Sequence, residues 1–277
     1  MTPGQAKRGD GMLVAARKDL EVAASKAAVD VRACFSRTDF DNVRLLMEKI
    51  WGPGVLVPAN VLRGLVLAGT PPLLAERSGD PVGFALGFAG SAGGLHFHSH
   101  QVGVVGAERG KGVGLVLKLA QRAACLEQDV SEMRWTFDPL LRANARFNLL
   151  RLGAQVRAFI PDCYGERSDA FNTGDRTDRL EVTWSLSEPL REPDVVGSHG
   201  AELVVDLVTL PRRSDAPAEA GALIAIPVDY LATRSNDLPC ANAWRCAVGQ
   251  ALSDMAEANL TVTALAPGGY VIGEVDA

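Results

Sequence analysis

A glycine-rich turn between a predicted strand and a predicted helix is the feature of this sequence that most restricts the fold. The strand covers about residues 95–105, and the helix extends to about residue 128. Between them stands Glu-Arg-Gly-Lys-Gly-Val-Gly at positions 108–114. Its three glycines let the backbone approach an anion closely, and the amide groups at a helix start point toward it with the positive end of the helix dipole. Arg109 and Lys111 add positive charge, so the turn predicts an anion-binding loop.

Two common phosphate loops do not fit this turn. A Walker A motif would need glycine at position 105 and serine or threonine at position 112, where Val105 and Gly112 stand. A dinucleotide-binding fingerprint that starts at Gly110 would need glycine at position 115, which is Leu115. The loop therefore belongs to another class of anion site.

The order of predicted elements indicates a mixed α/β (α+β) fold and not a strict β-α-β repeat. Strands are expected at about 29–37, 73–77, 82–88, 95–105, 133–137, 156–160 and 180–186, with helices at about 39–50, 59–68, 113–128 and 142–152. Residues 187–220 interrupt this pattern with Glu-Pro and Asp-Ala-Pro stretches around one apolar run at 203–210. We therefore expect a linker there, followed by a small α+β unit with strands at 223–230, 262–265 and 270–275 and a helix at 241–259.

Length and composition limit the organisation and the partners of the chain. The 277 residues suggest about two domains, and 47% hydrophobic with 22% charged residues is ordinary for a globular protein. We expect a mobile tail over 1–28, with a helical stretch at 13–28, a first domain over 29–187 and a linker with a C-terminal unit over 188–277. The net charge of −5 argues against nucleic-acid binding.

The expected location follows from the cysteines and from the absence of long apolar stretches. No run approaches the roughly 18 apolar residues of a membrane span, and the N-terminus lacks the apolar core of a signal peptide. The five cysteines are odd in number and include no Cys-x-x-Cys pair, which favours reduced thiols. We therefore expect a cytoplasmic protein that does not interact with a membrane.

The motifs resemble those of the GNAT superfamily of N-acetyltransferases, whose pyrophosphate loop reads Arg/Gln-x-x-Gly-x-Gly/Ala. Arg109 to Gly114 matches this pattern, the strand Val102-Gly103-Val104 stops five residues before it, and a helix from Asn144 ends at Gly153. The resemblance covers about residues 29–187. Further segments resemble a less characterised bacterial branch that carries a C-terminal extension: 98–100, 135–140, 144–148, 164–179 and 226–230.

The resemblance implies both a fold and a cofactor. The fold would be a mixed, mostly antiparallel central sheet flanked by helices, and the donor would be acetyl-CoA or another acyl-CoA, with succinyl-CoA plausible for this branch. The backbone before the loop would hold the thioester carbonyl, the loop would hold the pyrophosphate, and an asparagine would lie along the pantetheine arm. These cofactor-binding roles fall on Val102, Gly103 and Val104, then Arg109, Gly110, Lys111, Gly112, Val113 and Gly114, and finally Asn144.

Histidines on the strand before the loop are candidates for the catalytic base. His96, His98 and His100 have a spacing of two and would share one face of the strand. His98 stands six residues before Val104, where the histone-acetylating branch of the superfamily has its glutamate base. An imidazole suits removal of a proton from an amine. Two other interpretations remain open: histidines that are hydrogen-bonded in the sheet, and a metal site, which would lack nearby carboxylates.

The general acid departs from the pattern of the family. Many members have a tyrosine four residues before the glycine that ends the helix, and this chain has Leu149 there. Tyr164 could protonate the departing thiolate, and Asp138 could act through water. An ordinary loop anchor is an equally good interpretation of Tyr164. Asp169, Asp175 and Asp178 would either admit a cationic amine or form a solvated acidic loop.

The sequence predicts an acyl-CoA-dependent N-acyltransferase that acts on a small amine or amino-acid acceptor. Direct transfer in a ternary complex is expected, because no cysteine stands in a credible setting for a nucleophile. The alternatives are a non-catalytic acyl-CoA-binding module, a protein-lysine acetyltransferase and a metal-binding protein that uses the histidine strand. We expect no metal cofactor, and the sequence leaves a homodimer open.

Overall fold

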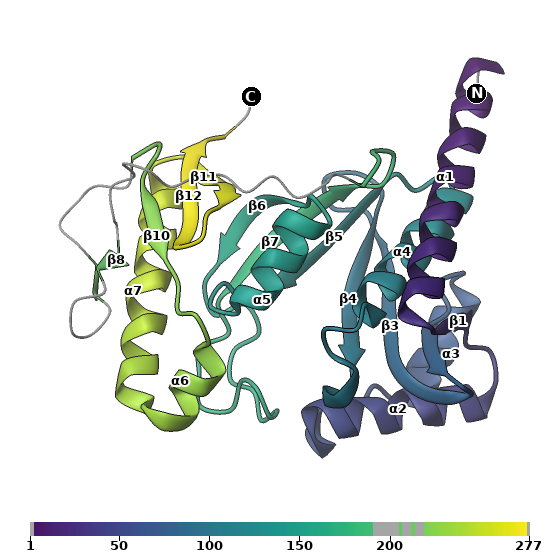
Figure 1. The fold of residues 1–277 in the computed structure, drawn as a ribbon, viewed down its shortest axis with the longest axis horizontal. Helices are drawn as coiled ribbons and strands as arrows, with labels where there is room; N and C mark the ends of the chain where they lie inside the picture. The colour runs from purple at the N-terminus through teal and green to yellow at the C-terminus, as the bar shows by residue number, and fades with distance from the viewer. Residues whose placement is uncertain (1–2, 191–204, 207–211, 214–218, 276–277) are drawn as a thin grey trace. The chain divides into compact units, whose positions relative to one another are not determined.

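The computed structural model describes residues 3–190, 205–206, 212–213 and 219–275, with side chains for 11–190 and 219–275 (Figure 1). The chain divides into two compact units. The first unit contains the residues up to Trp135, together with Ser168–Ala170 and Ser185–Pro189. The second contains Thr136–Arg167, Phe171–Trp184 and the chain from Leu190 onward.

The central sheet is mixed and mostly antiparallel. Its first strands are β1 (Asp30–Ala33), β2 (Leu73–Arg77), β3 (Asp80–Gly90), β4 (His96–Val104) and β5 (Glu132–Phe137). Neighbours pair antiparallel up to β4, whereas β4 and β5 are parallel. The sheet continues with β7 (Arg179–Ser185) and β6 (Gln155–Ile160), so the strand order is β1-β2-β3-β4-β5-β7-β6, and β5 contributes residues to both units. The predicted fold class is confirmed.

Helices cover both faces of the sheet in the first unit. They are α1 (Pro3–Ala27), α2 (Arg37–Trp51), α3 (Ala59–Leu67) and α4 (Val113–Glu127), with short turns η1 (Pro53–Val55) and η2 (Gly106–Glu108). A Cβ at Gly83 would meet Val113 and Leu117 of α4. A Cβ at Gly103 would meet Ile50 and Trp51 of α2, so α2 and α4 lie on opposite faces.

Helix α2 begins two residues before the start expected at about residue 39, and a capping box defines this start. Ser36 is the N-cap, and its hydroxyl accepts the amide N–H of Asp39 at 3.1 Å. The Asp39 carboxylate accepts the Ser36 amide in return at 2.9 Å. Two amide groups that a helix start leaves open are thereby satisfied, and the apolar side of α2 is fixed toward the sheet.

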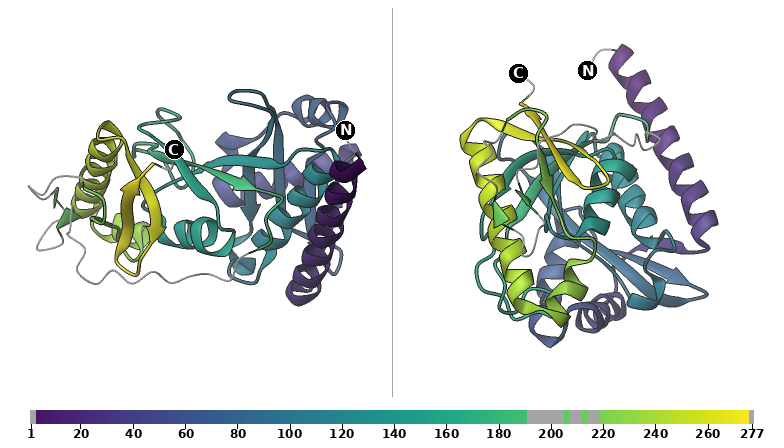
Figure 2. Two further views of the ribbon diagram at one scale, coloured as in Figure 1. Left: turned by 90° about the horizontal axis from the view of Figure 1, so that it is seen from above. Right: turned by 60° about the vertical axis from the view of Figure 1, so that its left-hand side comes forward.

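The N-terminal segment forms helix α1, which includes most of the helical stretch expected over 13–28 and packs along α4 (Figures 1 and 2). Ala16 is fully buried. Arg122 of α4, itself buried, donates to Asp19 of α1 at 2.8 Å. A buried guanidinium needs such a partner, so the ion pair ties α1 to the first unit.

The second unit combines the end of the central sheet with the C-terminal residues. It contains α5 (Arg142–Ala145), which continues as the π-helical segment η3 (Arg146–Arg151), and the antiparallel strands β6 (Gln155–Ile160) and β7 (Arg179–Ser185). A second sheet of order β10-β12-β11 is formed by β10 (Leu223–Ala225), β11 (Leu260–Leu265) and β12 (Gly269–Glu274). Helices α6 (Tyr230–Asn236) and α7 (Leu238–Glu257) and the two-residue strands β8 (Val205–Asp206) and β9 (Arg212–Arg213) complete it.

The compact units divide the chain at several points, the first of them between Trp135 and Thr136, and the domain bounds expected at 29–187 and 188–277 stay a prediction. Polar contacts join the segments of the second unit. The Arg142 guanidinium donates to the carbonyl oxygens of Ile226, Pro227, Pro267 and Gly268. The Tyr270 hydroxyl donates to the Pro139 carbonyl at 2.7 Å, and residues 136–167 are thereby joined to the C-terminal sheet.

The C-terminal part has a shorter strand than the sequence predicts. The strand expected over 223–230 ends at Ala225, because Asp229 caps α6 and its side chain accepts the amide of Ala232. Of the apolar run at 203–210, only 205 and 206 lie within the described residues.

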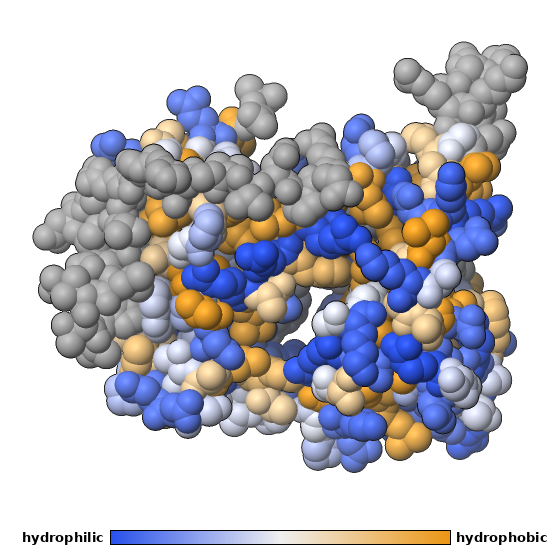
Figure 3. Space-filling model, in the orientation of Figure 1, coloured by the Kyte–Doolittle hydropathy of each residue, from blue (hydrophilic) through white to orange (hydrophobic). Residues whose placement is uncertain are grey.

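The described surface mixes polar and apolar residues. In the view of Figure 3, hydrophilic residues are interspersed with small apolar patches on both units. Within the described part of the chain, every helix is too short or too polar to cross a membrane.

Gly103 offers a test of the packing around β4. A Cβ there would lie 2.7 Å from Phe84 and 2.9 Å from Ile50, so Gly103→Ala should lower the free energy of unfolding by about 1–3 kcal/mol. Gly64→Ala is the control, since Gly64 is an exposed residue of α3 with open space around it, and it should stabilise by about 0.5–1 kcal/mol. Urea denaturation measures both. Equal stability of the Gly103→Ala variant and the wild type would contradict the packing.

Candidate functional site

The start of α4 has the geometry of an anion site. Gly112 precedes the helix in the left-handed conformation, with φ of 89°, and no side chain caps the helix. The first helical hydrogen bond runs from the Val116 amide to the Gly112 carbonyl at 3.1 Å. The amides of residues 113–115 precede this bond and therefore have no partner within the helix. They are available to an anion at the positive end of the helix dipole.

The loop before α4 is open on its outer side. Gly110 also has a positive φ, 78°, and an added Cβ at Gly110 or Gly114 would meet no atom within 4 Å. A ligand can therefore approach the backbone closely. These glycines show why the loop needs this residue type: at positions 110 and 112 any other residue would be strained.

Charged side chains surround the loop. Lys111 is half-exposed and donates to Glu108 at 3.2 Å, and Arg77 donates to the same carboxylate at 2.8 Å. The hydrogen bond from Lys111, together with that from Arg77, lowers the pKa of Glu108. The Arg109 side chain turns back and donates from Nε to the Val104 carbonyl at 3.3 Å. Arg109 thereby connects the loop to the end of β4.

Residues 102–104 of β4 have one paired edge. They pair with Ala85, Phe84 and Gly83 of β3. Among the described residues, the pairing of β4 with β5 includes Phe97 and His98 and does not continue toward Val104. The Val105 amide donates to Val82 of β3, and alternate residues of an antiparallel strand face the same neighbour, so the Gly103 backbone faces β3. The backbone groups of Val102 and Val104 therefore point to the edge that does not face β3.

A β-bulge separates this stretch from the histidines. Between the pairs Leu86–Gln101 and Phe88–His98, β4 contains one residue more than β3. Such a bulge redirects side chains and increases the local twist. The simple alternation assumed from the sequence therefore does not continue along the whole strand.

His98 and His100 lie close together beside Phe88. The two imidazole centroids are 6.0 Å apart, and the Phe88 ring stacks on His98 at 5.2 Å and lies 5.6 Å from His100. His96 is buried, and its Nδ1 is 2.8 Å from the Gly94 carbonyl. Burial, with smaller contributions from His100, His96 and Lys118, lowers the pKa of His98 to about 4. His98 is therefore uncharged at neutral pH.

The histidine strand does not form a metal centre in the described part of the chain. No group of three or more histidine, cysteine, aspartate or glutamate side chains is arranged there to hold a metal ion.

A buried lysine behind β4 is a feature that the sequence reading did not single out. Lys118 of α4 donates to the Ser99 hydroxyl at 2.9 Å, and Ser99 donates to Gln121 at 2.7 Å. The Lys118 ammonium lies 3.5 Å from the centroid of Trp135, and no carboxylate contacts it among the described residues. Burial lowers the pKa of Lys118 well below its ordinary value. The lysine stands within the apolar run 115–120, which could have indicated its burial.

In the second unit, Tyr164 lies on the loop between β6 and β7. Its hydroxyl is 2.8 Å from the hydroxyl of Thr136 on β5, and its amide donates to the Thr177 hydroxyl at 2.8 Å. The Arg179 guanidinium lies 5.5 Å from the centre of its ring. Tyr164 remains 39% exposed, although these contacts hold its hydroxyl and its backbone.

Asp138 and Asn144 also belong to the second unit, and their surroundings differ. Both oxygens of Asp138 accept hydrogen bonds from Arg245, at 2.9 and 2.7 Å, and one also accepts the Leu140 amide. Both carboxylate oxygens of Asp138 are thus occupied by Arg245. Asn144 lies exposed on α5, two residues after its start.

The acidic loop residues are mostly neutralised by arginines of the same unit. Asp175 pairs with Arg245, and Asp178 pairs with Arg176 at 2.7 Å. Asp169 is buried and belongs to the first unit. Asp175 and Asp178 are thus buried ion-pair partners, which fits neither a solvated acidic loop nor an open site for a cationic amine.

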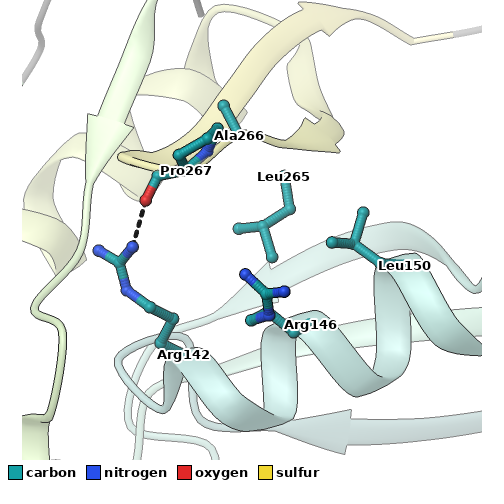
Figure 4. A pocket seen from close by; sticks show the side chains of 6 residues that line it. All are labelled: Arg142, Arg146, Leu150, Leu265, Ala266 and Pro267. Atoms are coloured by element: carbon teal, nitrogen blue, oxygen red, sulfur yellow. Dashed lines mark hydrogen bonds between the residues drawn. The ribbon is translucent and has the colours of Figure 1, made fainter. Parts of the chain in front are cut away.

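A small hollow in the second unit is lined by Arg142, Arg146, Leu150, Leu265, Ala266 and Pro267 (Figure 4). Arg142 points to the Pro267 carbonyl and donates to it, and Arg146 lies beside it. Arg142 thus joins α5 to the C-terminal sheet.

Comparison with known proteins gives similarity at the level of the fold. No family model matches the chain, and no curated protein matches it. Among solved structures, it is similar to Naa50 of Arabidopsis thaliana in complex with a bisubstrate analogue, at 18% identity over 57% of this chain and 99% of that chain, with a TM-score of 0.46.

Two further matches have the same character. One is the ribosomal-protein-S18-alanine N-acetyltransferase of Escherichia coli, at 12% identity over 58% of this chain and 95% of that chain, with a TM-score of 0.46. The other is YncA of Salmonella typhimurium with acetyl-CoA, at 20% identity over 61% and 99% of the two chains, with a TM-score of 0.46.

The pKa of His98 generates a prediction about stability. The unfolded chain protonates this imidazole near pH 6.5, whereas the folded protein does so only near pH 4. The unfolded state therefore binds more protons in that window, and stability should fall as the pH decreases from 6.5 toward 4. Urea unfolding at pH 7.5 and 5.0 should give a smaller decrease for His98→Gln than for the wild type. An equal decrease in both would contradict the burial of an uncharged His98.

Proposed function

We propose that the protein is an acyl-CoA-dependent N-acyltransferase that uses an acetyl or succinyl donor. The observation that carries this proposal is the uncapped start of α4 behind Gly110 and Gly112, with Arg109 and Lys111 beside it. Open amides, a helix dipole and two cations are suited to a pyrophosphate, which is the part of coenzyme A with the most charge. The resemblance of residues 109–114 to the GNAT loop supports the same assignment.

Residues 102–104 would bind the thioester. A backbone edge free of a second strand can donate hydrogen bonds to the thioester carbonyl, where negative charge develops during transfer. The loop at Arg109–Gly114 begins a few residues later, and the Arg109 side chain contacts the Val104 carbonyl. Asn144 is assigned to the pantetheine arm by the family resemblance alone.

The acceptor would be a small amine or an amino acid. Its ammonium group must lose a proton, and we assign this step to His98 with His100. An uncharged imidazole can accept the proton, although the low pKa of His98 makes it a weak base until the bound amine changes its surroundings. The attacking nitrogen lone pair forms the new C–N bond, and the C–S bond breaks to release the thiolate of coenzyme A. The nitrogen loses its second proton as the amide forms, which balances the proton that the thiolate takes up.

Tyr164 is the proposed donor of the proton that the thiolate takes up. Tyr164 is partly exposed and its hydroxyl is hydrogen-bonded to Thr136, whereas Asp138 is engaged by Arg245. We therefore favour Tyr164 over Asp138 for this role, which Leu149 cannot fill.

Direct transfer agrees with the state of the buried thiols. Burial raises the pKa of Cys34 and of Cys125 to about 12, and it also raises the pKa of Cys163. A thiol is nucleophilic only when deprotonated, so these three are unsuited to form an acyl-enzyme. We propose a ternary complex in which the amine attacks the thioester directly.

A second candidate function is a non-catalytic acyl-CoA-binding module. Leu149 at the position of the family tyrosine and the engaged Asp138 favour it. Binding of acyl-CoA without turnover of any amine would distinguish it from the enzyme.

Ligand-induced stabilisation tests the cofactor loop. CoA, acetyl-CoA or succinyl-CoA at about 100 times its Kd should add roughly 2.7 kcal/mol to the unfolding free energy and raise the melting temperature visibly. Arg109→Ala should remove most of this shift, while Arg63→Ala, an exposed arginine on α3, should retain it. If no thioester stabilises the wild type, the proposed function is wrong.

Tyr164→Phe tests the general acid. The variant keeps the ring but lacks the hydroxyl that contacts Thr136, so kcat should fall by about 100-fold while the KM for acyl-CoA stays nearly constant. Release of the CoA thiol in the presence of an amino-acid panel measures both constants. An unchanged kcat would rule out Tyr164 as the proton donor.

A further inference from the structure

One arginine of the C-terminal helix α7 holds two carboxylates from separate segments of the second unit. Arg245 is 4% exposed and donates to both oxygens of Asp138, at 2.9 and 2.7 Å. It also donates to both oxygens of Asp175, at 3.0 and 2.8 Å. Asp138 directly follows β5, and Asp175 lies in the loop between β6 and β7. We call these three residues the Arg245 bridge.

Helix α6 holds the same loop by independent contacts. The Tyr230 hydroxyl donates to Asp175 at 2.7 Å. Arg234 donates to the carbonyls of Phe171, at 2.6 Å, and Thr173, and its guanidinium lies 4.0 Å from Asp175. Residues 171–175 are therefore attached to α6 and α7 through charged hydrogen bonds, which are stronger than neutral ones.

Two routes connect the Arg245 bridge to Tyr164. Asp138 stands two residues after Thr136, whose hydroxyl contacts the Tyr164 hydroxyl at 2.8 Å. Asp138 also lies 3.9 Å from Arg179, which is placed over the Tyr164 ring and donates to Asn172 at 2.8 Å. The bridge thus contacts both the strand end that carries the partner of Tyr164 and the loop that carries Tyr164 itself.

The Arg245 bridge restricts the orientation of both carboxylates. The planar guanidinium fork fixes direction as well as distance, because each carboxylate is held through two hydrogen bonds. A buried charge network of this kind contributes little net stability but strongly specifies one arrangement when every member has a partner.

We propose that Arg245 is a positioning residue for acyl transfer: through Asp138 and Asp175 it keeps the Tyr164 hydroxyl against Thr136. This inference rests on the proposed function, in which Tyr164 protonates the departing thiolate. It gives the C-terminal helices a role in the reaction without contact to the reacting atoms.

A double-mutant cycle tests whether Arg245 acts through Tyr164. Arg245→Lys keeps the charge but cannot hold two carboxylates in the same geometry, so kcat should fall about tenfold or more while the KM for acyl-CoA is retained. In a Tyr164→Phe background the same substitution should cause little further loss, because the two changes affect one interaction. If the losses in kcat multiply, the positioning role is wrong and Arg245 is only structural.

Amide hydrogen exchange tests the same role without any measurement of activity. In Arg245→Lys, residues 161–167 should exchange faster than in the wild type, since the Tyr164 amide bonds Thr177 only while the loop is held. The matched control is Arg157→Lys on β6, whose ion pair with Glu181 at 3.1 Å is partly exposed, and it should leave these residues unchanged. Unchanged exchange in Arg245→Lys would overturn the proposal.

A milder variant covers the case in which Arg245→Lys does not fold. Tyr230→Phe removes only the hydroxyl bond to Asp175 and should change exchange and kcat in the same direction by a smaller factor. Unchanged exchange and kcat in a folded Tyr230→Phe variant would count against the bridge. Turnover by the wild type separates the positioning role from the proposed function. If the wild type turns over acyl-CoA but the losses in kcat multiply in the double mutant, only the positioning role is wrong. If the wild type turns over acyl-CoA with none of the amines, both proposals are wrong.

Discussion

The pairing of β4 is the constraint on which the first unit depends. One edge of this strand bonds β3 along most of its length, while the pairing with β5 among the described residues includes only Phe97 and His98. Backbone groups left open in a protein interior are costly unless water, a side chain or a ligand satisfies them. The stretch 102–104 combines this open edge with direct continuity to the glycine loop. A thioester with a pyrophosphate at its other end would satisfy both sets of groups.

The second unit is organised by compensation of buried charge. Asp138, Asp175 and Asp178 are nearly buried, and each is paired with an arginine. Burial acts to raise the pKa of Asp175, but the hydrogen bonds and charge of Arg245 outweigh it, so the pKa is lowered. Removal of either partner would leave an uncompensated charge, and this mutual dependence explains why residues 136–167 belong with the C-terminal helices.

The polar clusters around Lys118 and around Arg245 differ in chemistry. The buried amino group of Lys118 is surrounded by a hydroxyl, a thioether and an indole, and this environment disfavours its charged form. Around Arg245 two carboxylates stabilise the charged form of the guanidinium, although the side chain is buried. The first cluster supports the helix that carries the anion loop, and the second supports the loop that carries Tyr164. Neither needs to contact a substrate to influence the geometry of the proposed reaction.

Local sequence determined the elements and the glycine loop, because the forces behind them act over a few residues. Gly110 and Gly112 are required by backbone conformation alone, and Ser36 and Asp39 define the start of α2 through contacts three residues apart. The mixed fold class follows from the order of such elements. Tertiary structure decided the rest: Arg245 meets Asp138 across 107 residues, and Arg122 meets Asp19 across 103. Burial sets the protonation state of His98, and long-range ion pairs hold the segments of the second unit together. Neither effect can be predicted from the spacing of residues in the sequence.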